Sequence, residues 1–92
     1  MNWYDILLGA RRASHNGTRH ITARDLASEG RIPSSERSSP EKIASAWLGK
    51  FVRWGYAVRS GHIQGEKRWS RTYSLTKYGL ERPEPQPRGQ NE

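Results

Sequence analysis

The most constraining feature of the chain is the order of patterns between Ser39 and Leu80. A capped amphipathic segment ends at Gly55, and a short apolar strand pattern follows it. A basic stretch punctuated by glycines then leads into a second strand pattern. This order predicts one helix followed by a β-hairpin. The positive charge gathers in the same place: residues 40–81 have a net charge of +5, against +2 for residues 1–39.

Residues 40–54 are predicted to form the helix of this unit. Ser39 is a typical N-cap, Pro40 suits the first turn and Gly55 suits a left-handed C-cap. At about 100° per residue, the bulky apolar residues fall on one side, which we expect to face a core. These residues are Ile43, Ala44, Trp47, Leu48, Phe51 and Val52. The opposite side is small and basic, and consists of Lys42, Ser45, Ala46, Gly49, Lys50 and Arg53.

Gly49 is the unusual member of the small, basic side. A glycine inside a helix costs about 1 kcal/mol relative to alanine. The side could be an ordinary solvated face that tolerates this cost, or Gly49 could allow another helix of the chain to pack closely. It could also let a phosphate backbone or a base edge approach, with the flanking cations neutralising phosphates or reaching bases.

The hairpin is predicted from strands at Tyr56–Arg59 and Ser70–Leu75, with a turn-rich stretch between them. Its candidate contact residues are Arg59, His62, Gln64, Lys67, Arg68 and Arg71. Such a hairpin could lie along a minor groove, which attracts inserted arginine and lysine, or hold the flanking phosphates. Trp69 either stacks on a base or sugar or packs across the strands at the root of the hairpin, and the second role is favoured.

The segments on either side of this unit have weaker patterns. Residues 2–13 are predicted to form a first helix whose apolar stripe follows Trp3, Tyr4, Leu7, Leu8 and Arg11, with Ile6 and Ala10 beside it. Arg19–Ile21 could be a short first strand, and Thr22 is the expected N-cap of a second helix over Ala23–Ser28. Thr76 is expected to cap a final turn, and residues 82–92 are expected to form a disordered, proline-rich tail. A domain this small needs its large side chains, so we expect most of the nine aromatic residues to anchor the core.

Composition excludes several classes of protein. The chain has no cysteine, which rules out disulfides, thiolate catalysis and cysteine zinc sites. The histidines lack metal-ligand spacing, and no catalytic triad or phosphate-binding loop is visible, so we expect no metal, no cofactor, no small-molecule ligand, no catalytic residue and no enzyme activity. No apolar run reaches the roughly 20 residues that span a bilayer, and no signal peptide is visible. We therefore expect a cytoplasmic protein.

A net charge of +7 on 92 residues favours a nucleic-acid partner, although a basic chain can also be merely soluble. The whole pattern over about residues 3–81 resembles the winged helix-turn-helix superfamily. The resemblance rests on the G-Y-A-V-R run after the helix, the basic hairpin and the Tyr-x-Leu-Thr-x-x-Gly element at Tyr73–Gly79. The T-A-R-D-L-A run at Thr22–Ala27 is similar to the helix that precedes the recognition helix, but the connection over residues 29–39 is longer than a tight turn.

The resemblance implies an α+β winged-helix domain over residues 1–81, with three helices and a small antiparallel sheet. It implies that helix 40–54 enters the major groove of double-stranded DNA and that the wing, residues 59–71, holds the backbone or minor groove. A small prokaryotic or phage transcription regulator, nucleoid-associated when bound to DNA, is the expected function. The resemblance also implies a homodimer. The helix predicted over residues 2–13 would then offer the only apolar surface not needed for the core. The alternative is a winged-helix module that binds protein, RNA or a ribonucleoprotein.

Overall fold

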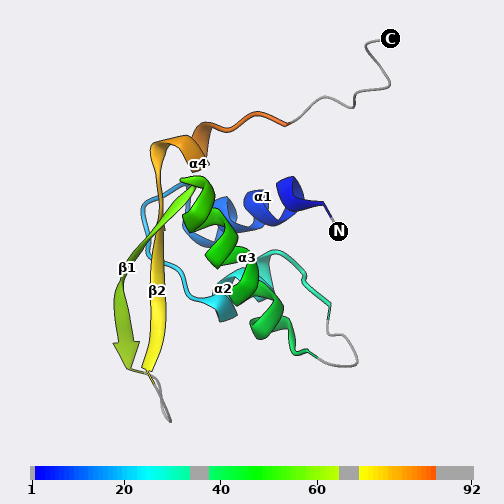
Figure 1. The fold of residues 1–92 in the computed structure, drawn as a ribbon, viewed down its shortest axis with the longest axis vertical. Helices are drawn as coiled ribbons and strands as arrows, with labels where there is room; N and C mark the ends of the chain where they lie inside the picture. Colours follow the sequence, from blue (N-terminus) through cyan, green and yellow to red (C-terminus); the bar gives the residue numbers. More distant parts are fainter. Residues whose placement is uncertain (1, 34–37, 65–68, 85–92) are drawn as a thin grey trace.

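The computed structural model describes residues 2–33, 38–64 and 69–84. Within them the chain forms four helices and one two-stranded antiparallel sheet. Their order is α1 (Trp3–Ala13), α2 (Ala23–Glu29), α3 (Pro40–Trp54), β1 (Ala57–Gln64), β2 (Trp69–Leu75) and α4 (Lys77–Glu81). The fold is α+β as predicted, and its arrangement is compatible with a winged helix. In Figure 1, α3 lies in front of α1 and α2, the β1–β2 hairpin runs alongside, and α4 sits near the C-terminal end of α3.

Local capping signals set the ends of the two central helices. The Thr22 hydroxyl accepts a hydrogen bond from Asp25 N at 3.3 Å, and the Asp25 carboxylate accepts one from Thr22 N at 2.9 Å, which completes a capping box. Ser39 Oγ accepts from Lys42 N at 3.3 Å at the start of α3. Gly55 ends α3 with a φ of 85°, a conformation that glycine adopts without steric cost. These predicted caps are confirmed.

The core is mostly aliphatic. The largest fully buried apolar side chains are those of Phe51, Ile6, Leu7, Ile21, Leu26 and Leu48. Among the aromatic side chains that the structure describes, Tyr56 and Tyr73 are also buried, but Trp54 is 43% exposed and Tyr78 is 54% exposed. Trp3, Tyr4 and Trp47 are partly buried and pack against the core. Six of the nine aromatic residues thus contribute to the core, as expected.

Helix α1 buries a face that only partly coincides with the predicted stripe. Leu7 and the neighbouring Ile6 and Ala10 are buried as expected, and Ala13 joins them. Trp3 and Tyr4 are partly buried against the core. Arg11 instead donates from Nε to the carbonyl oxygen of Gly79, at 3.0 Å. Much of the apolar face of α1 is thus taken up by the core.

The hairpin strands are longer than predicted. β1 continues through Gln64, so His62 and Gln64 lie on a strand rather than in a turn-rich loop. The register shifts between Arg59 and Gly61, where Gly61 adopts a φ of 144°. This irregularity accommodates Ser60 and lets pairing resume beyond it, which is the usual effect of a β-bulge.

Ile21 adds one bridge to the far side of β2. Its N–H donates to the carbonyl oxygen of Tyr73 at 2.8 Å, and Tyr73 N donates back to Ile21 O at 2.7 Å. The predicted first strand at residues 19–21 is thus a single bridge. Because β2 lies between Ile21 and β1, β1 is the outer strand of this arrangement.

Helix α4 joins the end of the hairpin to the end of α3. Thr76 Oγ1 donates to the carbonyl oxygen of Gly55 at 2.6 Å and accepts from Gly79 N at 3.1 Å. Gly79 is buried directly against the backbone of Tyr56, where a Cβ atom would overlap the carbonyl oxygen. The Thr-x-x-Gly element at residues 76–79 therefore has a packing role.

The start of the predicted tail is anchored to α1. The carbonyl oxygen of Arg82 accepts a hydrogen bond from Arg11 Nη2 at 2.6 Å. Residues 85–92, on which most of the prediction of a disordered tail falls, lie outside the described residues.

Candidate nucleic-acid interface

The exposed side of α3 is the one predicted to be small and basic. Its residues are Lys42, Ser45, Ala46, Gly49, Lys50 and Arg53, all exposed except Gly49, which is half-buried. We call this set the α3 outer face. The opposite side packs into the core through Ala44, Leu48 and Phe51, flanked by partly buried Ile43, Trp47 and Val52. The predicted division of the helix into two sides is confirmed.

Gly49 lies in open space. A Cβ atom placed there would have no heavy atom of a neighbouring group within 4 Å. Close packing of another helix against Gly49 is therefore not the reason for this glycine. The solvated face and the close approach of a partner remain as the two explanations.

Lys50 is positioned by an aromatic ring of its own helix. Its Nζ atom lies 4.4 Å from the centre of the Trp47 ring. An exposed contact of this kind contributes about 0.5–1 kcal/mol of attraction. The contact holds the ammonium group beside the α3 outer face and reduces its freedom before any partner binds.

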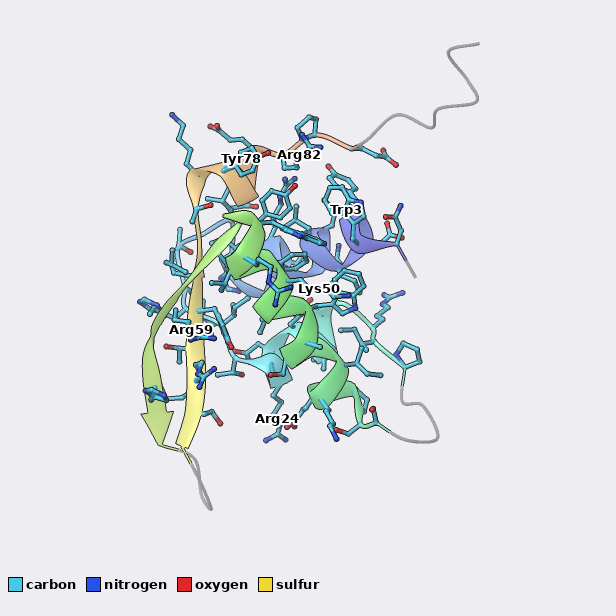
Figure 2. All side chains as sticks on the ribbon, in the orientation of Figure 1. Trp3, Arg24, Lys50, Arg59, Tyr78 and Arg82 are labelled. Atoms are coloured by element: carbon cyan, nitrogen blue, oxygen red, sulfur yellow. The ribbon has the colours of Figure 1, made fainter. Side chains whose placement is uncertain are left out.

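The hairpin contributes exposed cations beside α3. Arg59, His62 and Arg71 are exposed, and His62 pairs directly with Arg71 across the two strands, so these two side chains are neighbours on one face. Figure 2 shows α3 and the hairpin side by side, with Lys50 labelled on the helix and Arg59 on the strand. The α3 outer face together with Arg59, His62 and Arg71 is called the basic surface.

Three predicted contact residues are not placed as side chains. The backbone of Gln64 pairs with that of Trp69 at the far end of the hairpin, and Lys67 and Arg68 lie outside the described residues. The same pairing puts Trp69 at the far end of the hairpin. Its predicted position at the hairpin root is therefore wrong, because both strands are longer than expected.

The cations of the basic surface are not neutralised within the described part of the chain. Lys42, Lys50, Arg53, Arg59 and Arg71 form no ion pair with any carboxylate described there, whereas Arg24 Nε lies 4.0 Å from Glu41 Oε1. Unpaired cations on adjoining elements produce a local positive potential that attracts polyanions. The basic surface is thus suited to bind phosphates.

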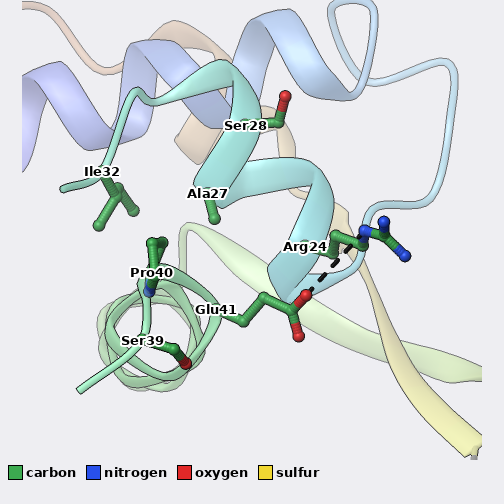
Figure 3. Close-up of a pocket in the computed structure, with 7 residues that line it drawn as sticks. All are labelled: Arg24, Ala27, Ser28, Ile32, Ser39, Pro40 and Glu41. Atoms are coloured by element: carbon green, nitrogen blue, oxygen red, sulfur yellow. Dashed lines mark ion pairs between the residues drawn. The ribbon is translucent and has the colours of Figure 1, made fainter. Parts of the chain in front are cut away.

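Two residues near this surface have no counterpart among the predicted contacts. Arg24 on α2 is exposed beside the first turn of α3 (Figure 3). His20 Nδ1 lies 2.7 Å from Ser60 Oγ, which in turn lies 3.0 Å from Thr72 Oγ1, so this chain of polar groups ties the segment before α2 to the hairpin. The position of Arg24 could have been predicted from its place just inside the N-cap of α2. The contact between His20 and Ser60 could not, because the two residues are 40 positions apart and no local sequence pattern indicates it.

A shallow hollow lies between α2 and the first turn of α3. Figure 3 shows its lining, which includes Ala27, Ile32 and Pro40 with the Arg24–Glu41 pair at one side. In the described residues no three histidine, aspartate or glutamate side chains gather in a position to hold a metal ion.

Comparison with known proteins found no matching family model, no matching curated protein and no matching solved structure. None of the helices in the described ranges has the length and apolar character needed to cross a membrane. Any functional conclusion for this chain therefore rests on its own residues.

Proposed function

We propose that the protein binds double-stranded DNA, as a small non-enzymatic transcription regulator associated with the nucleoid of the cytoplasm. The α3 outer face enters the major groove, and the hairpin holds the adjacent backbone or minor groove. The observation that carries this proposal is that Lys42, Lys50 and Arg53 surround the uncovered Gly49 without carboxylate partners among the described residues. The hairpin cations Arg59 and Arg71 lie on the neighbouring element.

The dimensions and chemistry of this face suit a groove. The major groove of B-DNA is about 12 Å wide and admits an α-helix. A strip of small side chains lets the helix backbone approach base edges, while longer cations at its margins reach phosphates, which position a protein on the duplex. Ser45, Ala46 and Gly49 form such a strip, and Lys50 and Arg53 border it.

The salt dependence of binding tests the proposal. Anisotropy of a labelled random duplex should give an affinity whose logarithm falls with the logarithm of salt at a slope of about −4 to −5, because about five cations would displace condensed counterions. A slope near zero, or no binding of duplex below micromolar concentrations, contradicts DNA binding. A preference for structured RNA over duplex in competition would instead favour the ribonucleoprotein alternative.

Removing single cations tests the assigned surface. Lys50→Ala and Arg53→Ala should each weaken binding and reduce the salt slope by about 1, as expected for the loss of one phosphate contact. Lys77→Ala is the matched control, because Lys77 is an exposed lysine of α4 outside the basic surface. Arg11 and Arg12 are poor controls, since their side chains hold backbone carbonyl groups. Equal losses in all three variants would show that α3 is not the contact surface.

Gly49→Ala separates the solvated face from a face that meets DNA. The change should stabilise the folded chain by up to about 1 kcal/mol, because alanine favours helix and its methyl group would meet open space. In the DNA complex the same methyl group must be accommodated, which typically costs about 1–3 kcal/mol and corresponds to about tenfold or more in affinity. Thermal melting and duplex titration measure both effects. A stabilised variant with unchanged affinity would contradict entry of this face into a groove.

A further inference from the structure

One end of the molecule has a cluster of four aromatic rings, two of which the core does not enclose. It brings together Trp3 of α1, Trp54 at the end of α3, Tyr56 just after α3, and Tyr78 of α4. The Trp3 and Tyr56 rings are stacked at 5.9 Å, Trp54 meets both edge-on at 6.2 and 5.9 Å, and Tyr56 lies 5.0 Å from Tyr78. These four residues with Arg82 are called the aromatic end. Figure 2 labels Trp3, Tyr78 and Arg82 in this region.

The aromatic end exposes more apolar ring surface than folding explains. Trp54 is 43% exposed and Tyr78 is 54% exposed, although each is in ring contact with a neighbour. The other large apolar residues exposed in the described chain, Val58 and Ile63, lie on β1 of the hairpin. Contiguous exposed apolar surface on a small protein marks an interaction site more often than scattered single residues do.

Arg82 places an unsatisfied polar group just beneath this surface. Its guanidinium carbon lies 5.9 Å from the centre of the Trp3 ring, and its Nε atom is buried without a hydrogen-bond partner. It is the one buried side-chain nitrogen or oxygen of the described residues in this state. A buried donor without an acceptor is unfavourable, and rearrangement of the guanidinium against an incoming acceptor would relieve it. Tryptophan, tyrosine and arginine are also the residues most enriched at the energetic centres of protein interfaces.

The charges next to the aromatic end favour a second copy of this chain. Asp5, Glu81 and Glu84 are exposed within three residues of Trp3, Tyr78 and Arg82 respectively. The basic surface, in contrast, has five cations that form no ion pair within the described parts of the chain, so two such surfaces would repel one another. In a two-fold interface the same patch is used by both copies, so a contact from residue i to residue j is repeated from residue j to residue i. A carboxylate of each copy can therefore meet Arg82 of the other copy.

We propose that the protein forms a homodimer through the aromatic end. Trp54 and Tyr78 of the two copies cover one another, and acidic groups of each copy supply acceptors for Arg82 of the other. The paired ends of the strands at Gln64 and Trp69 lie toward the opposite end of the molecule from α4 (Figure 1), so that part of both hairpins stays free in the dimer. This proposal concerns self-association and holds or fails independently of DNA binding.

Sedimentation velocity of the full chain without DNA tests the dimer. Between about 1 and 100 μM, where specific dimers of modest affinity form, the wild type should shift from the 10.6 kDa chain toward twice that mass. Tyr78→Glu should raise the dissociation constant by roughly thirtyfold or more, the size of loss expected at an interface centre. Ile63→Glu is the matched control, because Ile63 is also 54% exposed but lies on the hairpin, and it should leave the dimer intact.

A second variant guards against a folding defect in the first. Arg82→Ala removes the guanidinium but keeps the backbone carbonyl that Arg11 holds, so the monomer should melt at nearly the wild-type temperature while the dimer weakens. A wild type that stays monomeric throughout overturns the proposal. If removal of residues 85–92 then allows dimerisation, the occupant of the aromatic end is the chain's own tail. A dimer disrupted by Ile63→Glu but not by Tyr78→Glu or Arg82→Ala also overturns it.

Discussion

Phe51→Ala is expected to lower the free energy of unfolding by about 3–5 kcal/mol, the usual cost of truncating a buried aromatic side chain. Phe51 is fully buried, and its ring centre lies 6.0–6.1 Å from those of Trp47, Trp54 and Tyr56. Its removal leaves a cavity at the point where α3 meets the segment leading into β1. Since small domains are stable by only about 5–15 kcal/mol in total, the variant should be largely unfolded at mild urea concentrations.

Urea denaturation followed by circular dichroism measures this effect. Val58→Ala is the matched control, because Val58 is 50% exposed and its truncation should change the midpoint little. The sequence pattern puts Trp47 and Phe51 on the same face of the helix and predicts equal losses for both. The structure leaves Trp47 only partly buried, so Trp47→Ala should cost less than Phe51→Ala. A Phe51→Ala protein with the wild-type midpoint would show that the core is assigned incorrectly.

Gly79→Ala is expected to destabilise the protein by at least about 1–3 kcal/mol, the typical cost of overpacking. A Cβ atom at this position would overlap the carbonyl oxygen of Tyr56 and lie 2.9 Å from its carbonyl carbon. Both are backbone atoms, so a side-chain rotation cannot relieve the overlap. Helix α4 would have to move away from the end of α3, which would also strain the hydrogen bond from Arg11 to the Gly79 carbonyl oxygen.

The control for Gly79→Ala is Gly49→Ala, which makes the same chemical change in a helix. Gly49 faces open space, so this variant should melt at a higher temperature than the wild type while Gly79→Ala melts at a lower one. Helix propensity alone would raise the stability of both variants, so opposite changes in melting temperature would exclude it as the explanation. If Gly79→Ala also gained stability, the contact between α4 and Tyr56 would be wrong.

Much of the basic surface could be predicted because the side of a helix follows from spacing. Lys42, Lys50 and Arg53 were expected on the outer side of α3, and all three are exposed there. The hairpin residues were less predictable. Glycine and polar residues between Ser60 and Gln64 favour a turn, but pairing with β2 and a bulge at Ser60 keep this segment extended. Tertiary pairing thus outweighed local propensity, which is common in strands.

The aromatic end could not be predicted at all. Trp3, Trp54 and Tyr78 are far apart in the sequence, and each lies in a segment where an apolar residue is expected to turn inward. Their ring contacts arise because α4 folds back onto Tyr56 and the N-terminal end of α1 lies beside it. Because Tyr56 already occupies the space between these elements, the rings of Trp54 and Tyr78 remain partly exposed to solvent.

The amino-acid sequence by itself determines the helix ends, the two sides of α3 and the excess of positive charge. Caps and helix sides depend on residues within about four positions of each other, so their physics is local. The length of the hairpin and the exposure of the aromatic end are decided only by the tertiary structure. These features result from competition among distant segments for a core too small to enclose every large side chain of a 92-residue chain.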